Sequence, residues 1–203
     1  MSSSILPLFP TPLYNCYLTL PEIEVNHIKN MQMVDRPEGY ISDSRDVINE
    51  DSTPTIYHQL IQHASVFVES IGYDFNVKLV SSWTNLHKTG NSSRRHIHSN
   101  SIFGGVIFLD TPQDTGEFLV FNPSVNGTRM FSTHILVDKT NITQYNVEYH
   151  TIKPQTGQCL FFPSFLPHTV TENKSDLDRW TIGFDFFASG TLRQGKLGQI
   201  TFC

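Results

Sequence analysis

One long stretch of helical periodicity stands out in the first half of the chain. The stretch covers residues 54–71. Thr53-Pro54 provides a favourable helix start before it, and Gly72 provides a stop signal after it. The apolar residues of this stretch recur at intervals of three and four: Ile56, Leu60, Ile61, Ala64, Phe67, Val68 and Ile71. The pattern predicts an amphipathic helix that packs one face against a sheet.

The second half of the chain consists of short apolar runs separated by turns, which is typical of antiparallel β-structure. The expected strands cover 76–87, 102–109, 116–121, 147–152, 158–162, 169–171, 179–187 and a final short run at 200–203. Gly104-Gly105 within one run indicates close backbone approach. Because no repeat or linker divides the chain, we expect a single domain over residues 1–203. Its predicted fold class is mainly β, a double-stranded β-helix of the jelly-roll or cupin type, buttressed by one or two N-terminal helices.

The remaining N-terminal and central segments are less regular. Prolines interrupt the apolar residues of 5–20, which predicts an extended lead-in or edge strand. Residues 21–31 begin with proline and two glutamates and suit a short helix. Residues 34–53 are polar and acidic, and we interpret them as a loop over a site. Residues 128–146 have no assignable pattern and, with 34–53, are candidate lids.

Composition narrows the function classes. The 203 residues are 38% hydrophobic and 16% charged, with a formal net charge of −5 and an isoelectric point near 5.9. These values are typical of a globular protein, and the net negative charge argues against nucleic-acid binding as its function. The N-terminus resembles neither a signal peptide nor a membrane span. Three unpaired cysteines, Cys16, Cys159 and Cys203, favour reduced thiols and a cytoplasmic location.

Three histidines and one arginine provide the candidate chemistry. His96 and His98 begin the strand expected at 102–109, and in an extended backbone their side chains point to the same face. His168 lies far along the chain beside another strand-like run, and Arg179 begins the next. Three such ligands can hold a metal ion on one side and leave positions open for substrate and O₂. The pattern predicts a non-haem iron site with Arg179 placed to hold an acidic co-substrate. We interpret the other histidines as ordinary surface or core residues without a role in the site, namely His27, His58, His63, His134 and His150.

Four motifs carry a resemblance to a known family. They are Leu8–Tyr14, Ser82–Asn85, His96–Leu109 and Phe162–Val170. The chain contains H-x-H, then G-x-x-x-x-F-P-S-x-x-x-H, and then an arginine. This order of motifs resembles that of the 2-oxoglutarate/Fe(II)-dependent oxygenases. The chain is most similar to the small oxygenases of this class from phages and marine bacteria; for a phage protein, the cytoplasm would be that of the host.

The resemblance implies an enzyme that oxidises a substrate C–H bond while 2-oxoglutarate is decarboxylated to succinate and CO₂. Its cofactors would be Fe(II) and 2-oxoglutarate, and the iron-ligand histidines of the family correspond to His96 and His168. Arg179 matches the residue that pairs with the distal carboxylate of 2-oxoglutarate, and Thr181 matches the small hydroxyl residue that follows. A guanidinium suits a carboxylate because its fork bonds both oxygens. Trp83 and Asn85 are assigned to the co-substrate site. The alternative, that they are only core and turn residues, stays open.

One position departs from the family pattern. Most members have Asp or Glu where this chain has His98. Three neutral ligands leave the ion one negative charge short, which should weaken its binding or alter its reactivity. Asp110 lies at the other end of the following strand, and the amide of Asn100 is a poor ligand. We therefore assign His98 as the second ligand.

Three functions follow from these residues. The first is a 2-oxoglutarate-dependent dioxygenase, a hydroxylase acting on a small molecule or a protein side chain with O₂, without a membrane partner. The second is a cupin-like metalloprotein with three histidines that does not use 2-oxoglutarate. The third is a jelly-roll interaction module with chance histidines. A homodimer is one assembly that the sequence leaves open.

Overall fold

The computed structural model describes residues 4–5, 8–123 and 138–202. The expectations for residues 128–137, for His134 and for Cys203 therefore lie outside the described residues. Within the described ranges, no helix is long and apolar enough to cross a membrane.

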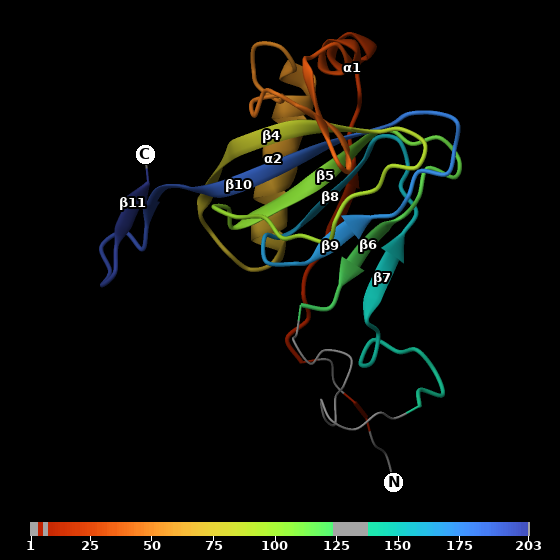
Figure 1. The fold of residues 1–203 in the computed structure, drawn as a ribbon. Coiled ribbons are helices and arrows are strands. Elements are labelled where there is room, and N and C mark those ends of the chain that lie inside the picture. Colours follow the sequence, from red (N-terminus) through yellow and green to blue (C-terminus); the bar gives the residue numbers. More distant parts are fainter. Residues whose placement is uncertain (1–3, 6–7, 124–137, 203) are drawn as a thin grey trace.

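The described residues form two antiparallel sheets and two helices (Figure 1). The larger sheet has the order β1-β8-β5-β10-β4-β3-β2, with β11 paired to β10. Its strands are β1 (Tyr14–Tyr17), β2 (Met33–Arg36), β3 (Gly39–Ser42), β4 (Asn76–His87), β5 (Phe103–Asp110), β8 (Gln158–Pro163), β10 (Arg179–Leu192) and β11 (Ile200–Phe202). The smaller sheet has the order β7-β6-β9, from β6 (Phe118–Phe121), β7 (Tyr149–Ile152) and β9 (His168–Val170).

Helix α2 (Pro54–Ser70) is the one that the apolar periodicity predicts, and it covers the outer face of the larger sheet (Figure 1). Its buried residues pack with alternate residues of β10, namely Ile182, Phe184 and Phe186. The shorter helix α1 (Glu22–Lys29) lies where the N-terminal proline and glutamates indicate. Helix α1 also caps α2, because the buried carboxylate of Glu24 accepts hydrogen bonds from the backbone N–H groups of Thr55 and Ile56 at 3.0 Å.

The inner face of the larger sheet meets the smaller sheet in a second apolar cluster. Val106 and Phe108 of β5 and Leu160 and Phe162 of β8 pack there against the smaller sheet's Phe118, Val120 and Val170 and against Leu166. The two layers confirm the expected mainly β, antiparallel architecture of the double-stranded β-helix. The polar side chains of β10 lie on this same inner face of the larger sheet.

Two sequence predictions were wrong in detail. Residues 34–53 are not one loop, because β2 and β3 form a hairpin within this range that pairs onto β4. Likewise, His96 and His98 do not begin the strand at residue 102. A turn at Asn100, whose φ is 59°, separates them from β5 and lets them run along the other sheet.

Candidate metal centre and arginine pocket

An extended segment brings His96 and His98 beside His168. His96 and His168 form an antiparallel bridge in which each backbone N–H donates to the other's carbonyl at 3.0 Å. The backbone N–H of His98 donates to the carbonyl of Ser164 at 3.0 Å. The segment is thus an added edge of the smaller sheet beyond β9, so residues far apart in sequence become neighbours.

The three imidazoles converge from this edge. One nitrogen from each ring lies within 4.8 Å of the others, which is a spacing that could hold a metal ion. The ring centroid of His168 lies 4.2 Å from that of His96 and 5.0 Å from that of His98. The structure therefore brings together all three histidines that the sequence analysis selected.

Each histidine is oriented by a hydrogen bond at Nδ1. His96 Nδ1 donates to the carbonyl of Arg94 at 2.8 Å, and His168 Nδ1 donates to the carbonyl of Leu166 at 2.9 Å. His98 Nδ1 donates to Oδ1 of Asp185 at 2.7 Å. An oxygen acceptor at Nδ1 fixes the proton there and leaves the Nε2 lone pair free. All three rings therefore present the nitrogen that can bind a metal.

The pKa values of two of these rings are lowered, and that of the buried His168 is lowered further than that of the more exposed His96. Desolvation, and then the neighbouring His96, lower the pKa of His168 to about 3. Desolvation also lowers the pKa of His96, against a smaller raising effect of its bond to Arg94. A metal ion competes with protons for imidazole nitrogen, so neutral rings are ready to bind at neutral pH.

A row of inward-facing positions on β10 leads away from the histidines. Because side chains alternate along a strand, Arg179, Thr181, Gly183 and Asp185 share the face opposite the one that packs on α2. Three residues of β4 are their register partners: His87 opposite Arg179, Asn85 opposite Thr181 and Trp83 opposite Gly183. Asp185 ends the row beside His98, and Arg179 begins it at the far end.

Arg179 is fully buried and only partly satisfied. Its Nη1 donates to the carbonyls of Thr115 and, at 3.1 Å, Thr171. Among the described residues, Nε and Nη2 have no hydrogen-bond partner, and neither has Nδ1 of the adjacent His87. Burial lowers the pKa of Arg179 to about 10, so the guanidinium remains protonated at neutral pH. Burial, and then Arg179, lower the pKa of His87 to about 3.

Trp83 connects the two ends of the row. A Cβ at Gly183 would lie 2.5 Å from the Trp83 ring, so the indole rests directly on the backbone of β10. The centroid of the Trp83 ring lies 5.4 Å from that of His98, and the Arg45 guanidinium lies 5.9 Å from the Trp83 ring. Trp83 therefore forms a wall beside the histidines.

Two residues at the site were missed by the sequence analysis. His87 and Asp185 continue the alternation that begins at Trp83 and Arg179, so strand parity places them on the inner face. This alternation was the signal in the sequence that could have identified both residues. Asp110 instead pairs with Lys29 at 2.9 Å and does not belong to the histidine cluster.

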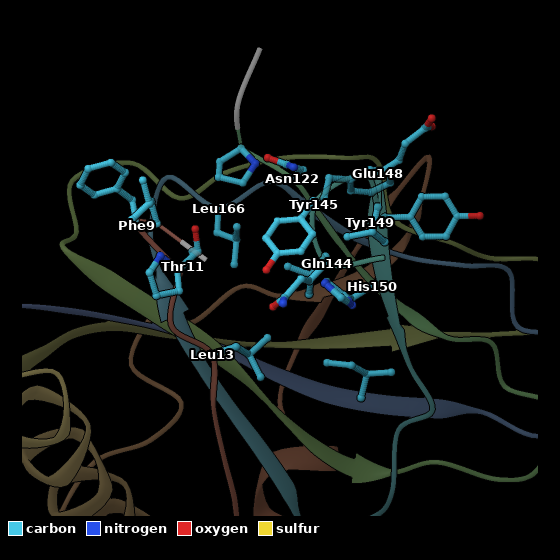
Figure 2. Close-up of a pocket in the computed structure, with 17 residues that line it drawn as sticks. Phe9, Thr11, Leu13, Asn122, Gln144, Tyr145, Glu148, Tyr149, His150 and Leu166 are labelled. Carbon is cyan, nitrogen blue, oxygen red and sulfur yellow. The ribbon is translucent and has the colours of Figure 1, made fainter. Parts of the chain in front are cut away.

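A cavity of about 610 Å³ lies beside the smaller sheet and contains none of the three histidines (Figure 2). In Figure 2, the N-terminal residues Phe9, Thr11 and Leu13 lie across it from Tyr145 and His150. The cavity adjoins the centre through Leu166, whose carbonyl orients His168.

Comparisons with known proteins agree with this geometry. A family model with the description "Putative 2OG-Fe(II) oxygenase" matches residues 81–185, just over half of the chain. The matched range contains the three histidines and Arg179, and it ends at Asp185. No curated protein sequence matches the chain.

Solved structures share the fold at low sequence identity. A prolyl-4-hydroxylase from Pseudomonas putida has a TM-score of 0.57 at 15% identity, covering 89% of this chain and 94% of its own. The α-ketoglutarate-dependent epimerase SnoN from nogalamycin biosynthesis has a TM-score of 0.59 at 14% identity, covering 92% and 83%. HygX from Streptomyces hygroscopicus, with nickel, 2-oxoglutarate and hygromycin B bound, has a TM-score of 0.55 at 10% identity, covering 87% and 83%.

Proposed function

Because the chain belongs to the 2OG-Fe(II) oxygenase family, we propose that it hydroxylates a small molecule or a protein side chain. Fe(II) is its metal and 2-oxoglutarate its co-substrate. In this proposal His96, His98 and His168 hold Fe(II) through Nε2, and Arg179 pairs with the distal carboxylate of 2-oxoglutarate. The two unpartnered nitrogens of the Arg179 guanidinium, Nε and Nη2, carry the proposal.

The three histidines suit Fe(II) by donor type and by protonation. Imidazole nitrogen is an accepted ligand for iron, and three ligands on one side leave open positions. The hydrogen bonds at Nδ1 hold each ring in the tautomer with Nε2 free. When bound, Fe(II) and 2-oxoglutarate supply the oxidising chemistry, in which O₂ oxidises the substrate C–H bond and 2-oxoglutarate becomes succinate and CO₂.

Arg179 needs an anionic partner. A buried cation with unpaired N–H groups is costly, and the described residues around Nε and Nη2 offer no acceptor. A carboxylate can accept from both groups at once, since the guanidinium fork matches its two oxygens. His87 Nδ1 is equally unpartnered and buried at the same register, so it can contribute a neutral contact to the same anion.

Three further residues shape the path between the arginine and the histidines. Thr181 is 2% exposed and offers a hydroxyl next to Arg179 on the inner face. Its register partner Asn85 offers an amide, and Trp83 closes the side near His98. We assign Thr181, Asn85 and Trp83 to binding the co-substrate and excluding water from it, which strengthens the Arg179–carboxylate pair.

Anaerobic titration tests the proposal. Fe(II) and then 2-oxoglutarate are added to the apo-protein while the visible charge-transfer absorption of the chelate is followed. We expect the band in the wild type, its loss in His168→Ala, and weaker 2-oxoglutarate binding with normal Fe(II) binding in Arg179→Ala. His58→Ala is the matched control, because His58 is an exposed histidine on α2 whose side chain is 63% exposed.

The outcomes separate the functions. A band with these variant effects supports the oxygenase assignment, and succinate formation with trial substrates then identifies the hydroxylated compound. If Fe(II) binds and 2-oxoglutarate changes nothing, the three-histidine metalloprotein replaces it. If Fe(II) does not bind, the metal assignment of the three histidines is wrong.

A further inference from the structure

Asp185 is a buried carboxylate that faces one of the three histidines. Its Oδ1 accepts the hydrogen bond from His98 Nδ1 at 2.7 Å. The side chains of His98 and Asp185 are only 5% and 11% exposed. A buried carboxylate is expensive unless it is paired, so this contact is the feature that makes its position tolerable.

The backbone leaves room for the pair at one glycine. Gly104 of β5 is the register partner of Asp185. A Cβ at Gly104 would lie 2.6 Å from the backbone carbonyl oxygen of Phe184, 2.7 Å from His98 Nδ1 and 2.8 Å from Asp185 Oδ1, which is closer than side chains pack. Any other residue would push the imidazole and the carboxylate apart. Gly104 therefore belongs to the construction of the pair.

A local irregularity in the sheet occurs at the same place. The register between β10 and β4 shifts by one residue between Asp185 and Phe186. Bulges of this kind redirect side chains and are frequent beside active sites. Asp185 is thus held at the end of the inner row of β10, opposite the ring of His98, by features of two neighbouring strands.

The charge of the centre explains what the pair accomplishes. Mononuclear Fe(II) oxygenase sites usually combine two histidines with one carboxylate, whereas the three groups that converge here are all imidazoles. A carboxylate bonded to the far nitrogen of a metal-binding histidine fixes the ring orientation and raises its basicity as a ligand. Asp185 places a carboxylate at this position, one imidazole away from the ion.

We propose that Asp185 is a positioning residue that, through His98, orients the second metal ligand and supplies the negative charge that a carboxylate ligand would supply directly. The His98–Asp185 pair then acts as one unit in place of that carboxylate. The inference rests on the proposed function only in that the three histidines bind the metal; it requires neither 2-oxoglutarate nor turnover.

The test uses apo-protein and Co(II) alone, with affinity from calorimetry and site geometry from the visible d–d absorption. Asp185→Asn preserves the size of the side chain and removes its charge. We expect about 10- to 100-fold weaker Co(II) binding, the usual cost of losing such a partner, with an altered d–d spectrum. Asp110→Asn is the matched control: it also removes one aspartate charge from the larger sheet, at the pair with Lys29, and should bind Co(II) like the wild type.

A double-mutant cycle separates positioning from general destabilisation. If Asp185 acts through His98, Asp185→Asn has no further effect on Co(II) affinity in a His98→Ala background. A purely structural role would lower affinity equally in both backgrounds.

Unchanged Co(II) affinity and spectrum in a folded Asp185→Asn variant would overturn the inference, as would additive effects in the cycle. Should the variant not fold, histidine nitrogen NMR of the Zn(II)-loaded wild type decides the matter. We expect His98 to carry its proton on Nδ1 with a strongly downfield resonance; a proton on Nε2 contradicts the proposal. If Co(II) results agree but 2-oxoglutarate fails to bind, the inference stands and the oxygenase proposal falls.

Discussion

The two ends of the inner row of β10 differ in how completely their polar groups are satisfied. At the histidine end, every Nδ1 donates to an oxygen of the protein itself. At the arginine end, two nitrogens of Arg179 and one of His87 are buried without partners among the described residues. The first end is preorganised by its own hydrogen bonds, and the second is organised for a group that comes from outside.

This difference has an energetic consequence. Unpaired buried donors cost about 1–3 kcal/mol each, so the arginine end destabilises the free protein. A ligand that satisfies them binds the folded state alone and returns that free energy. We therefore expect mutations at the histidine end to affect the metal, and mutations at the arginine end to affect the co-substrate and the stability of the free protein.

The largest effect is expected from His168→Ala. The substitution removes a ligand nitrogen from the centre, so Fe(II) affinity should fall by more than the about 100-fold that loss of a supporting partner costs. Turnover should fall below detection. Calorimetric titration of Fe(II) under argon measures the first effect. Retained affinity would break the comparison, because it would mean that the ion is held elsewhere.

Replacing Arg179 should have the next largest effect and should leave the metal alone. In Arg179→Met, 2-oxoglutarate loses a buried charged partner worth about 2–5 kcal/mol, so its affinity should fall at least about 30-fold. Arg179→Lys keeps the charge without the fork and should fall between the wild type and Arg179→Met. Fe(II) affinity serves as the internal control, and an equal loss of both ligands would contradict the separation of the two ends.

The same variant should make the free protein more stable. Arg179→Met replaces a buried, partly unpaired cation with an apolar chain of similar length. Such replacements are often neutral or stabilising by about 1–4 kcal/mol. Urea unfolding of the apo-protein measures the change, and a clear loss of stability would show that the bonds of Arg179 to Thr115 and Thr171 outweigh the unpaired groups.

A smaller effect should appear as pH dependence of apo-protein stability. The pKa of His87 is about 3 in the folded state, against about 6.5 in an unfolded chain. Its contribution to stability is therefore complete above pH 6.5 and declines as the pH falls toward 3, by about 1.4 kcal/mol per pH unit. Between pH 7 and pH 5 the loss is about 2 kcal/mol.

The contribution is measured by difference. Urea unfolding of wild type and His87→Gln at both pH values should show a smaller pH effect in the variant. His58→Gln, at an exposed position, should behave like the wild type. An identical pH effect in wild type and His87→Gln would mean that His87 is not kept neutral by burial beside Arg179.

The sequence predicted the helix at 54–71 and most strands because these follow from local patterns, whereas the convergence of His96, His98 and His168 was expected from the order of motifs that resembles the oxygenase family. The spacing of apolar residues indicates whether a segment is a helix or a strand. Because side chains alternate along a strand with a period of two, their positions also indicate the face on which each side chain lies. The hairpin of β2 and β3 escaped prediction because each strand has only two adjacent apolar residues, Met33-Val34 and Tyr40-Ile41, in a largely polar segment. Its position depends on the long-range pairing of β3 with β4.

The sequence analysis missed Asp185 and His87 for a different reason. Asp185 faces His98, and His87 faces Arg179, only through the register of β10 with β4 and β5 and the turn at Asn100. Register depends on which strands pair, and no local pattern contains it. The sequence therefore identified the groups that we propose to bind the ligands and missed the groups that orient or accompany them.

The smallest effect expected at the arginine end concerns the hydroxyl of Thr181. This residue lies between Arg179 and Gly183 on the inner face and is 2% exposed. In Thr181→Val, shape is preserved and one neutral hydrogen bond to the co-substrate is lost, worth about 0.5–1.5 kcal/mol. The affinity for 2-oxoglutarate should fall by about 2- to 10-fold, with Fe(II) affinity unchanged. Thr191→Val, at an exposed position of the same strand, is the control. If Thr181→Val weakens Fe(II) binding instead, Thr181 belongs to the histidine end, and the boundary between the two ends lies closer to Arg179.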